Sequence, residues 1–312
     1  MNLHLLRIFC AVAEQRSFSR AAAALFISQP AVSRAVRELE HQLELPLLER
    51  GGGGARGARG VRLTESGAAL FDHARGIFAL ERAASDEVRA RVGLRRGRLI
   101  VGASTTIAGY WLPGYAAELA RRHPDIQLQI RVGNTSAIAQ ALIDCQIDVA
   151  VVEGDVQDAR IEARPWRDEE LQILTAAAAP LARRRKPPLA ELNAAMWLVR
   201  EPGSGTRAVT DRLMNTYGLE PARLLEYASN EGIARAVAAG LGIAMLPAQV
   251  ARDLVNIGAL RALPLPAPAP APAPAPAATP LTRPLFLLQL RERPPSPLVR
   301  AFRELLMAGR PA

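Results

Sequence analysis

Three short helical patterns near the N-terminus, separated by tight breaks, constrain the fold of this chain more than any other feature. The first pattern runs over residues 3–14. Ser17 is placed to cap a second, alanine-rich helix over residues 18–25, and Ser28 is placed to cap a third. Pro30 lies in the first turn of the third helix, where its missing N–H does no harm. Three short helices with a tight turn between the second and the third predict a helix-turn-helix.

The third helix has two distinct faces. The apolar side chains that recur at helical spacing, and that we expect to be buried, are Val32, Val36, Leu39 and Leu43. On the polar side, Gln29 can pair with adenine and Arg34 with guanine if the helix enters the major groove of DNA, and Ser33 can bond to a base or a phosphate. The residues that we expect to meet phosphates are Arg37, Arg50 and Arg62. The alternative interpretation is that all of these are ordinary exposed polar residues of a small helical bundle.

A glycine-rich segment and a long helix follow. Residues 51–60 read GGGGARGARG and predict no regular structure, whereas residues 61–63 predict a short strand. Thr64 caps a helix of about 28 residues that we expect to end near Val92. Its single apolar stripe requires a partner, most simply the same helix of a second subunit. The stripe consists of Leu70, Ala74, Ile77, Leu80, Ala84 and Val88.

From Arg98 onward, apolar strands alternate with helical patterns, which is typical of an α/β domain. The expected strands lie at residues 99–101, 126–132, 148–152, 171–175, 197–199, 243–246 and 285–290. The last expected helix covers residues 298–307. Residues 264–280 form a Pro-Ala repeat, which predicts a stiff polyproline insertion or spacer on the surface.

The charge of the chain is uneven. Its formal net charge is +9, and residues 1–98 hold 16 Arg against 10 Asp and Glu, a surplus of six. This asymmetry suggests a polyanion as partner, most commonly nucleic acid. No apolar run approaches the length of a membrane span, and the first residues lack the pattern of a secretion signal. We therefore expect a cytoplasmic protein, and the spacing of His and Cys predicts no metal site and no cofactor.

Two turns predict a ligand site. Each follows an expected strand and precedes a helix, so each places hydroxyls and free backbone N–H groups at a helix N-terminus, which suits anions. The residues are Ser104, Thr105 and Thr106 in the first turn and Ser204, Gly205, Thr206 and Arg207 in the second. Asn134, Thr135 and Glu153 are expected to complete the site. The alternative for either turn is simple helix capping.

The residue pattern of the N-terminal region closely resembles the DNA-binding domain of LysR-type transcriptional regulators. The run SFSRAAAALFISQPAVSRAVRELEHQLELPLLER, followed by VRLTESG, carries the resemblance over most of residues 3–67. It implies a winged helix-turn-helix in which Gln29, Pro30, Ser33 and Arg34, next to Ser28, read DNA. The glycine-rich stretch lengthens the wing relative to the family pattern. Residues 102–113 and 200–207, with 133–135 and 151–154, are similar to the branch that regulates carbon-fixation genes (CbbR-like) and sulfur assimilation (CysL-like).

The resemblance also implies the architecture of the whole chain. It predicts a DNA-binding domain over residues 1–64, a dimerisation linker helix over 65–93 and an effector-binding α/β domain over 94–312. That last domain would consist of two Rossmann-like subdomains, as in type 2 periplasmic binding proteins, with a ligand cleft between them. The boundaries expected within it are 94–165 plus 281–312 for the first subdomain, 166–263 for the second and 264–280 for the Pro-Ala insertion.

The function that follows is a regulator of transcription that binds double-stranded DNA and responds to a small, anionic metabolite. The family implies a homotetramer, although the sequence itself argues only for a dimer through the long helix, and RNA polymerase is a conceivable further partner. Two alternatives stay open. One is a cytoplasmic small-molecule-binding module without specific DNA readout; the other is an enzyme on the same fold, which the lack of a catalytic constellation disfavours.

Overall fold

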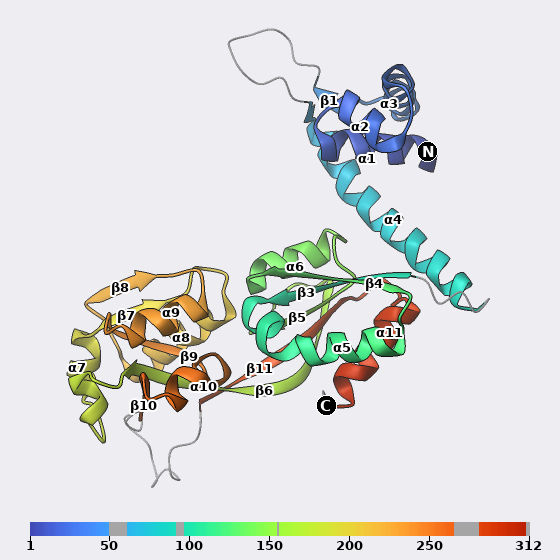
Figure 1. Cartoon of the computed structure of the whole chain (residues 1–312). Coiled ribbons are helices and arrows are strands. Elements are labelled where there is room, and N and C mark those ends of the chain that lie inside the picture. The colour runs from blue at the N-terminus through green and yellow to red at the C-terminus, as the bar shows by residue number, and fades with distance from the viewer. Residues whose placement is uncertain (50–60, 92–96, 155, 265–280, 310–312) are drawn as a thin grey trace. The chain divides into compact units, whose positions relative to one another are not determined.

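The computed structural model of the 312-residue chain describes residues 1–49, 61–91, 97–154, 156–264 and 281–309 (Figure 1). The glycine-rich stretch 51–60, Arg50 and almost all of the Pro-Ala repeat lie outside the described residues. The chain divides into two compact units, Met1–Ala84 and Ser85–Ala312, and each is described by itself.

The first unit is the predicted helix-turn-helix followed by the long helix. Its elements are α1 (Leu3–Gln15), α2 (Phe18–Leu25), α3 (Gln29–Leu43), β1 (Leu48–Glu49), β2 (Arg62–Leu63) and α4 (Glu65–Arg91), the last of which continues into the second unit. The two short strands pair antiparallel. The predicted caps are confirmed: the Ser17 hydroxyl accepts a hydrogen bond from the backbone N–H of Arg20, and that of Ser28 accepts one from Ala31.

The predicted inner face of α3 lies in the core of this unit. Val32, Val36 and Leu39 are buried against residues of α1 and α2, and Leu43 is half-buried at the margin. The start of α4 shares this core through Ala74, which is fully buried. Farther along the predicted stripe, Leu80 is 50% exposed and Val88 is 63% exposed. Among the residues that the structure describes, only the first part of the stripe is therefore covered.

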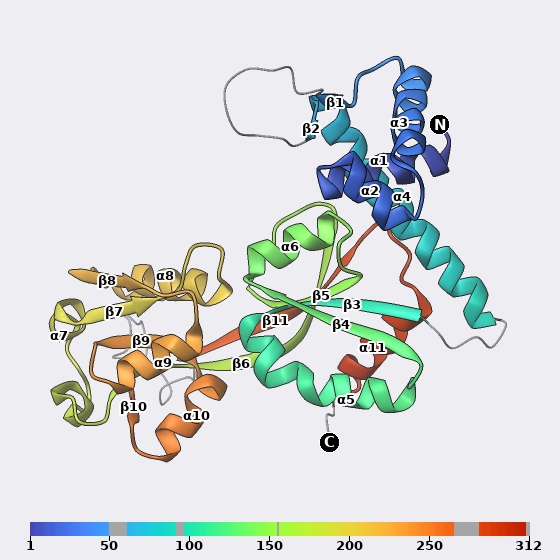
Figure 2. The ribbon, with the colours of Figure 1, turned by 45° about the horizontal axis from the view of Figure 1, so that its top comes forward.

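The second unit contains a nine-stranded mixed sheet, with eight strands in the order β4-β3-β5-β11-β6-β9-β7-β8 and β10 paired with β6 (Figures 1 and 2). The strands are β3 (Gly97–Ser104), β4 (Ile126–Gly133), β5 (Val149–Glu153), β6 (Ile161–Ala176), β7 (Met196–Val199), β8 (Arg223–Glu226), β9 (Ile243–Pro247), β10 (Leu260–Leu263) and β11 (Leu281–Leu290). The helices are η1 (Ile107–Trp111, a π-helix), α5 (Leu112–Arg122), α6 (Thr135–Ile143), η2 (Pro180–Arg183, a 3-10 helix), α7 (Leu189–Ala194), α8 (Gly205–Tyr217), α9 (Asn230–Ala238), α10 (Ala248–Asn256) and α11 (Pro297–Met307).

This unit has two halves, each with helices on both faces of its part of the sheet. In the first half, which contains β3, β4 and β5, one core lies beneath α5 and α11 and another beneath α6. In the second half, which contains β7 to β10, α7 and α8 cover one face and α9 and α10 the other. Each half thus has helices on both faces of its strands, and the α/β domain that the alternating pattern predicted is confirmed.

Two long strands belong to both halves. The 16-residue strand β6 pairs with β11 from Ile161 to Leu171, and its last residues pair with β9 and β10 of the second half. The sequence predicted only residues 171–175 and 285–290 as strands, so the structure extends both predicted strands toward the junction of the halves. The domain and subdomain boundaries given above stay predictions. Among the described residues, no helix is long and apolar enough to cross a membrane.

One half-buried carboxylate connects α3 to the start of the wing. Glu40 Oε1 accepts hydrogen bonds from the backbone N–H groups of Leu47 (2.8 Å) and Leu48 (3.2 Å). Both leucines are buried, so their backbone N–H groups lose a hydrogen-bond acceptor when the carboxylate is removed. We expect Glu40→Ala to lower the free energy of unfolding of the first unit by about 1–3 kcal/mol, measured by urea denaturation.

Hydrogen–deuterium exchange of the full chain localises this effect, with faster exchange expected at residues 47–48. The matched control is Glu38→Ala on the exposed side of the same helix, where the carboxylate bonds only to the Gln42 side chain. An equal loss in both variants would contradict the assignment.

Candidate DNA interface and ligand site

The N-terminal end of α3 presents an uninterrupted exposed surface. Ser28, Gln29 and Pro30 are all exposed, and Arg34 is exposed one turn later. Arg34 forms no hydrogen bond or ion pair with any other residue that the structure describes, so its guanidinium is available to an outside acceptor. Free polar side chains at the N-terminal end of such a helix have the chemistry that base edges require.

The other predicted DNA contacts differ from Arg34 in how they are held. Arg37 donates to the Ser33 carbonyl (3.3 Å) and to the Ser33 hydroxyl (3.2 Å), which fixes both side chains on one side of α3. Arg62 is largely exposed on β2 and lies 4.0 Å from Glu49, a weak surface pair. Arg50 lies outside the described residues.

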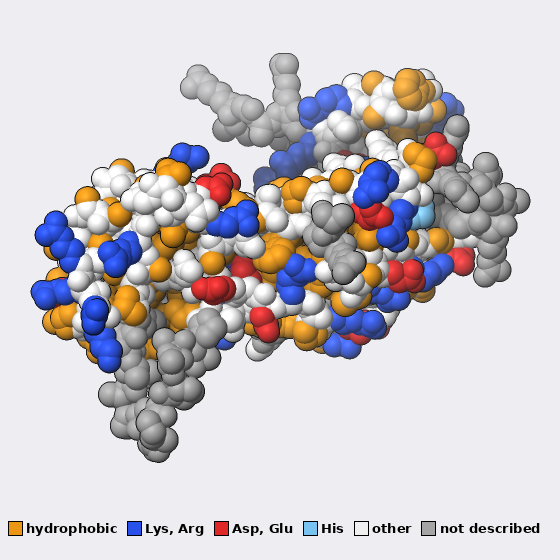
Figure 3. Space-filling view, turned by 60° about the horizontal axis from the view of Figure 1, so that its bottom comes forward, with side chains coloured by type: hydrophobic (Ala, Val, Ile, Leu, Met, Phe, Trp, Pro, Cys, Tyr) orange, Lys and Arg blue, Asp and Glu red, His pale blue; other side chains and the backbone are white. Residues whose placement is uncertain are grey.

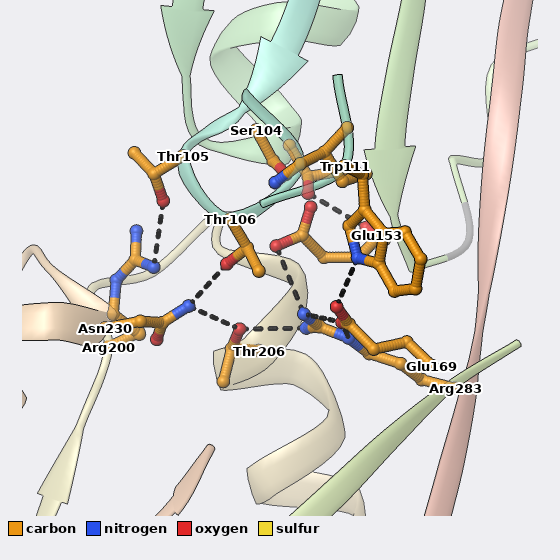
Figure 4. Close-up of polar contacts among 12 residues, drawn as sticks. Ser104, Thr105, Thr106, Trp111, Glu153, Glu169, Arg200, Thr206, Asn230 and Arg283 are labelled. Atoms are coloured by element: carbon orange, nitrogen blue, oxygen red, sulfur yellow. Dashed lines mark hydrogen bonds and ion pairs between the residues drawn. The ribbon is translucent and has the colours of Figure 1, made fainter. Parts of the chain in front are cut away.

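The predicted ligand-site turns meet where the two halves of the second unit join (Figure 4). Ser104 ends β3 and Glu153 ends β5, and these neighbouring strands are parallel, so both residues lie at the same edge of the sheet. Ser204 is the N-cap of α8, and Gly205 packs directly on Glu153. A Cβ atom at position 205 would lie 2.3 Å from the Glu153 carbonyl oxygen, so only glycine allows this approach.

Asn230, at the start of α9, connects the two turns. Its Nδ2 atom donates to Thr106 Oγ1 (2.8 Å) in the first half and to Thr206 Oγ1 (3.3 Å) in the second. All three residues are at most 4% exposed. Both threonine oxygens therefore act as acceptors here, which leaves each hydroxyl hydrogen available for donation.

A buried ionic cluster lies beside these threonines. Arg283 on β11 faces Glu169 on β6 across the strand pair, and the guanidinium donates to Glu169 Oε2 at 2.6 and 2.8 Å. The same guanidinium donates to Thr206 (2.8 Å) and lies 3.4 Å from Glu153 Oε1. The second oxygen of Glu153 is buried without a partner, as is Asn230 Oδ1. One guanidinium thus faces two carboxylates, so the cluster holds no surplus positive charge.

A second buried guanidinium is also compensated. Arg200, directly after β7, donates to both oxygens of Glu201 (2.7 and 2.9 Å) and to Thr105 Oγ1 (3.4 Å). Burial acts to raise the pKa of Glu201, but hydrogen bonds from Arg200 and from its own backbone outweigh it and hold that pKa below its usual value. Glu201 therefore stays ionised near neutral pH.

The remaining predicted ligand residues divide into two groups. Asn134 caps α6 and donates to Glu201 across the junction (3.3 Å), and the Thr135 hydroxyl donates to the Glu153 carbonyl (2.9 Å). Both belong to the junction. Arg207, in contrast, bonds to Asp211 one turn along α8 and to the Arg200 carbonyl, so its charge is compensated locally.

Several polar residues of the junction were not predicted from the sequence. They are Arg200, Glu201, Asn230, Arg283, Glu169 and Trp111, whose indole N–H donates to Glu169 Oε1 (2.8 Å). The one available signal for Arg283 was that this charged residue interrupts the largely apolar run 281–290. No group of three or more His, Cys, Asp or Glu suited to a metal occurs among the described residues.

The surface in Figure 3 gives no sign of one extended basic stripe. Over its middle and right parts, blue basic side chains and red acidic ones are interspersed, with apolar patches between them, whereas only blue side chains appear at its left end.

The fold defines a class of DNA-binding protein: a helix-turn-helix with an exposed polar face on α3, joined to an α/β unit whose two halves enclose buried polar groups. Family models bear this out. Residues 3–68 match the "Bacterial regulatory helix-turn-helix protein, lysR family", and residues 93–310 match the "LysR substrate binding domain". The chain belongs to the LysR family of transcriptional regulators, with an effector-binding domain.

Individual relatives agree with this assignment. The chain is 32% identical to the transcriptional regulator CysL of Bacillus subtilis, over 82% of this chain and 84% of that protein. It is 33% identical to CbbR of Rhodospirillum rubrum, over 83% and 84%. Among solved structures, full-length OxyR from Pseudomonas aeruginosa superposes with a TM-score of 0.70 at 26% identity, covering 99% of this chain and 94% of that one. The predicted resemblance to the CbbR-like and CysL-like branch is confirmed, as is the prediction that the chain is not an enzyme, since these relatives are named as regulators.

The buried ionic cluster makes a strong prediction about stability. Arg283→Met leaves Glu153 and Glu169 buried without a counter-charge, and we expect the free energy of unfolding of the second unit to fall by about 3–5 kcal/mol in urea denaturation. Adding Glu153→Gln and Glu169→Gln to Arg283→Met removes the uncompensated charges and recovers a large part of that loss. If the triple variant were no more stable than the single one, the loss would come from packing and not from charge.

Proposed function

We propose that this protein reads a specific DNA sequence with α3 and that a small effector, bound where the two halves of the second unit join, controls its action. The observation that carries the proposal is the exposed N-terminal end of α3 with the unpaired Arg34 guanidinium. A guanidinium held by its own protein would have to break a bond before it could reach a guanine. Arg34 has no such bond to break among the described residues.

The DNA-binding residues have separate roles in this proposal. Gln29, Ser33 and Arg34 contact base edges in the major groove, with Ser28 and Pro30 setting the start of the helix. Arg37, Arg50 and Arg62 contact phosphates. These contacts fix the position of the protein along the duplex but carry no sequence information. The DNA partner places the protein in the cytoplasm, and RNA polymerase is the natural further contact of a regulator bound at a promoter.

The effector is a small anion held by hydroxyls and helix N-termini. Arg283 and Arg200 already face carboxylates, so neither guanidinium is free to neutralise an added anion. The groups that can donate are the hydroxyls of Thr106 and Thr206 and the backbone N–H groups at the start of α8. The full set that we assign to the effector is Ser104, Thr105, Thr106, Asn134, Thr135, Glu153, Ser204, Gly205 and Thr206, with Arg207 as a positioning residue behind α8.

Ligand binding changes the angle between the halves, as in type 2 periplasmic binding proteins, and thereby the spacing of DNA-binding domains in an oligomer. We infer a linker helix over 65–93 that pairs with its copy through the exposed part of its stripe, and a tetramer of two such dimers. The proposed domains are 1–64 for DNA and 94–312 for the effector, the latter divided as predicted from the sequence.

Arg34→Ala tests the DNA part. Because a bidentate contact to guanine supplies discrimination, we expect the ratio of operator to scrambled-DNA affinity to fall by about 10- to 100-fold at one fixed salt concentration. A footprint upstream of the protein's own gene supplies the operator, and fluorescence anisotropy supplies the affinities. Arg212→Ala, which removes an exposed arginine from α8, is the control for net charge. If discrimination survives in Arg34→Ala, the protein binds DNA by charge alone or acts as a small-molecule-binding module.

Thr206→Val tests the effector part, since valine keeps the shape of threonine and removes the hydroxyl. The screen uses small carboxylates and phosphate esters, read by thermal unfolding and by the operator footprint. For any compound that raises the Tm of the natural protein, we expect the Kd to rise at least about tenfold in Thr206→Val, while operator affinity without ligand stays within about twofold. Thr216→Val on the exposed side of α8, where the hydroxyl bonds only to the Arg212 carbonyl, is the matched control.

A further inference from the structure

One aromatic side chain in the first unit is exposed to solvent and stands on a backbone conformation that is unfavourable for it. Phe26 is 95% exposed, more than any other large hydrophobic residue that the structure describes. It is also one of the few described non-glycine residues with a left-handed backbone, at φ 55° and ψ 38°. Bulky residues rarely adopt this conformation, which favours glycine and asparagine.

The backbone around Phe26 explains why the conformation is required. The N–H of Phe26 donates to the Ala23 carbonyl (3.3 Å), and the N–H of Ile27 donates to the Ala22 carbonyl (3.1 Å). These two bonds form a Schellman motif, in which the residue after the helix is left-handed and is usually glycine. Phe26 therefore ends α2 at a position where its side chain adds strain and contributes no buried surface to the unit.

The position of Phe26 indicates what covers its ring. It stands three residues before Gln29, so their Cα atoms are at most about 11 Å apart. Residues 26 to 30 are all exposed and form one continuous surface that leads into the reading end of α3. When the N-terminal end of a recognition helix enters the major groove, the turn before it comes to the groove edge. Phenylalanine is among the side chains that make apolar contact with thymine methyl groups there.

We propose that Phe26 is a DNA contact, whose ring packs on apolar atoms of the DNA, a thymine methyl or a deoxyribose, beside the bases that α3 reads. This inference rests on the proposed DNA-reading role of α3. It adds a contact of a different kind, because the ring forms no hydrogen bond and releases no counterion. Its contribution is therefore insensitive to salt, unlike that of the arginines.

The left-handed backbone makes Phe26→Asn a discriminating variant. Asparagine suits the conformation better than phenylalanine, so we expect the Tm of the full-length protein to stay the same or to rise. Operator affinity is expected to fall about 5- to 30-fold, with the slope of log K against log salt unchanged. Phe26→Leu, which keeps an apolar side chain, is expected to recover part of the affinity.

The control is Leu45→Asn, which removes a half-exposed apolar side chain beyond the other end of α3. It should leave operator affinity unchanged. Replacing each operator thymine by deoxyuridine then identifies the contact. If the ring contacts a thymine methyl, replacement of one particular thymine lowers the affinity of the natural protein but not that of Phe26→Asn. If the ring contacts a deoxyribose, no thymine position shows this difference.

Several results would overturn the proposal. Unchanged operator affinity in Phe26→Asn, while Arg34→Ala still loses discrimination, would remove Phe26 from the interface and leave the DNA-reading role of α3 intact. If Phe26→Asn keeps its operator affinity and Arg34→Ala keeps its discrimination, the proposed DNA-reading function itself is wrong. A lower Tm or a smaller salt slope in Phe26→Asn would mean a structural effect, and a changed oligomeric state in sedimentation would mean that the ring contacts protein.

Discussion

The antiparallel pairing of β6 with β11 is the interaction on which the second unit depends. These strands run through both halves, so the turns that carry the ligand-site residues are held by one shared pair of strands. Arg283 and Glu169 face each other on this pair, and their hydrogen bonds join it to Thr206 at the start of α8. The register shifts between Leu285 and Phe286, and such a bulge bends and twists a strand pair locally.

Several of the contacts that cross the junction are single hydrogen bonds between polar side chains. Asn230 bonds to Thr106, and Tyr110 on the π-helix η1 donates to Glu231 on α9 (2.9 Å). Burial and the hydrogen bond to Glu231 raise the pKa of Tyr110 to about 12, so this contact persists over the physiological pH range. Each such bond contributes roughly 1 kcal/mol net. A ligand that makes bonds in only one arrangement of the halves can thus shift their equilibrium.

The sequence predicted well those features that depend on residues close together along the chain. Ser17 and Ser28 cap helices because serine oxygens accept from N–H groups a few residues away, and the hydroxyl turns were found by the same reasoning. Arg283 could not be found in this way, because its partner Glu169 lies 114 residues away and the pair exists only through strand register. Strand β6 was underpredicted because six of its first ten residues, IEARPWRDEE, are charged and the segment includes Pro165. The bond of Arg207 to Asp211, in contrast, follows from helical spacing and was readable in advance.

Helix α4 has a double role that bears on how a signal could reach α3. Its start is part of the core of the first unit through Ala74, while Leu80 and Val88 farther along remain exposed. Proline, a common cause of sharp kinks, is absent from α4, although the helix contains Gly67 and Gly76. A partner that covered the exposed part would therefore contact the same continuous helix whose start packs in the core of the first unit.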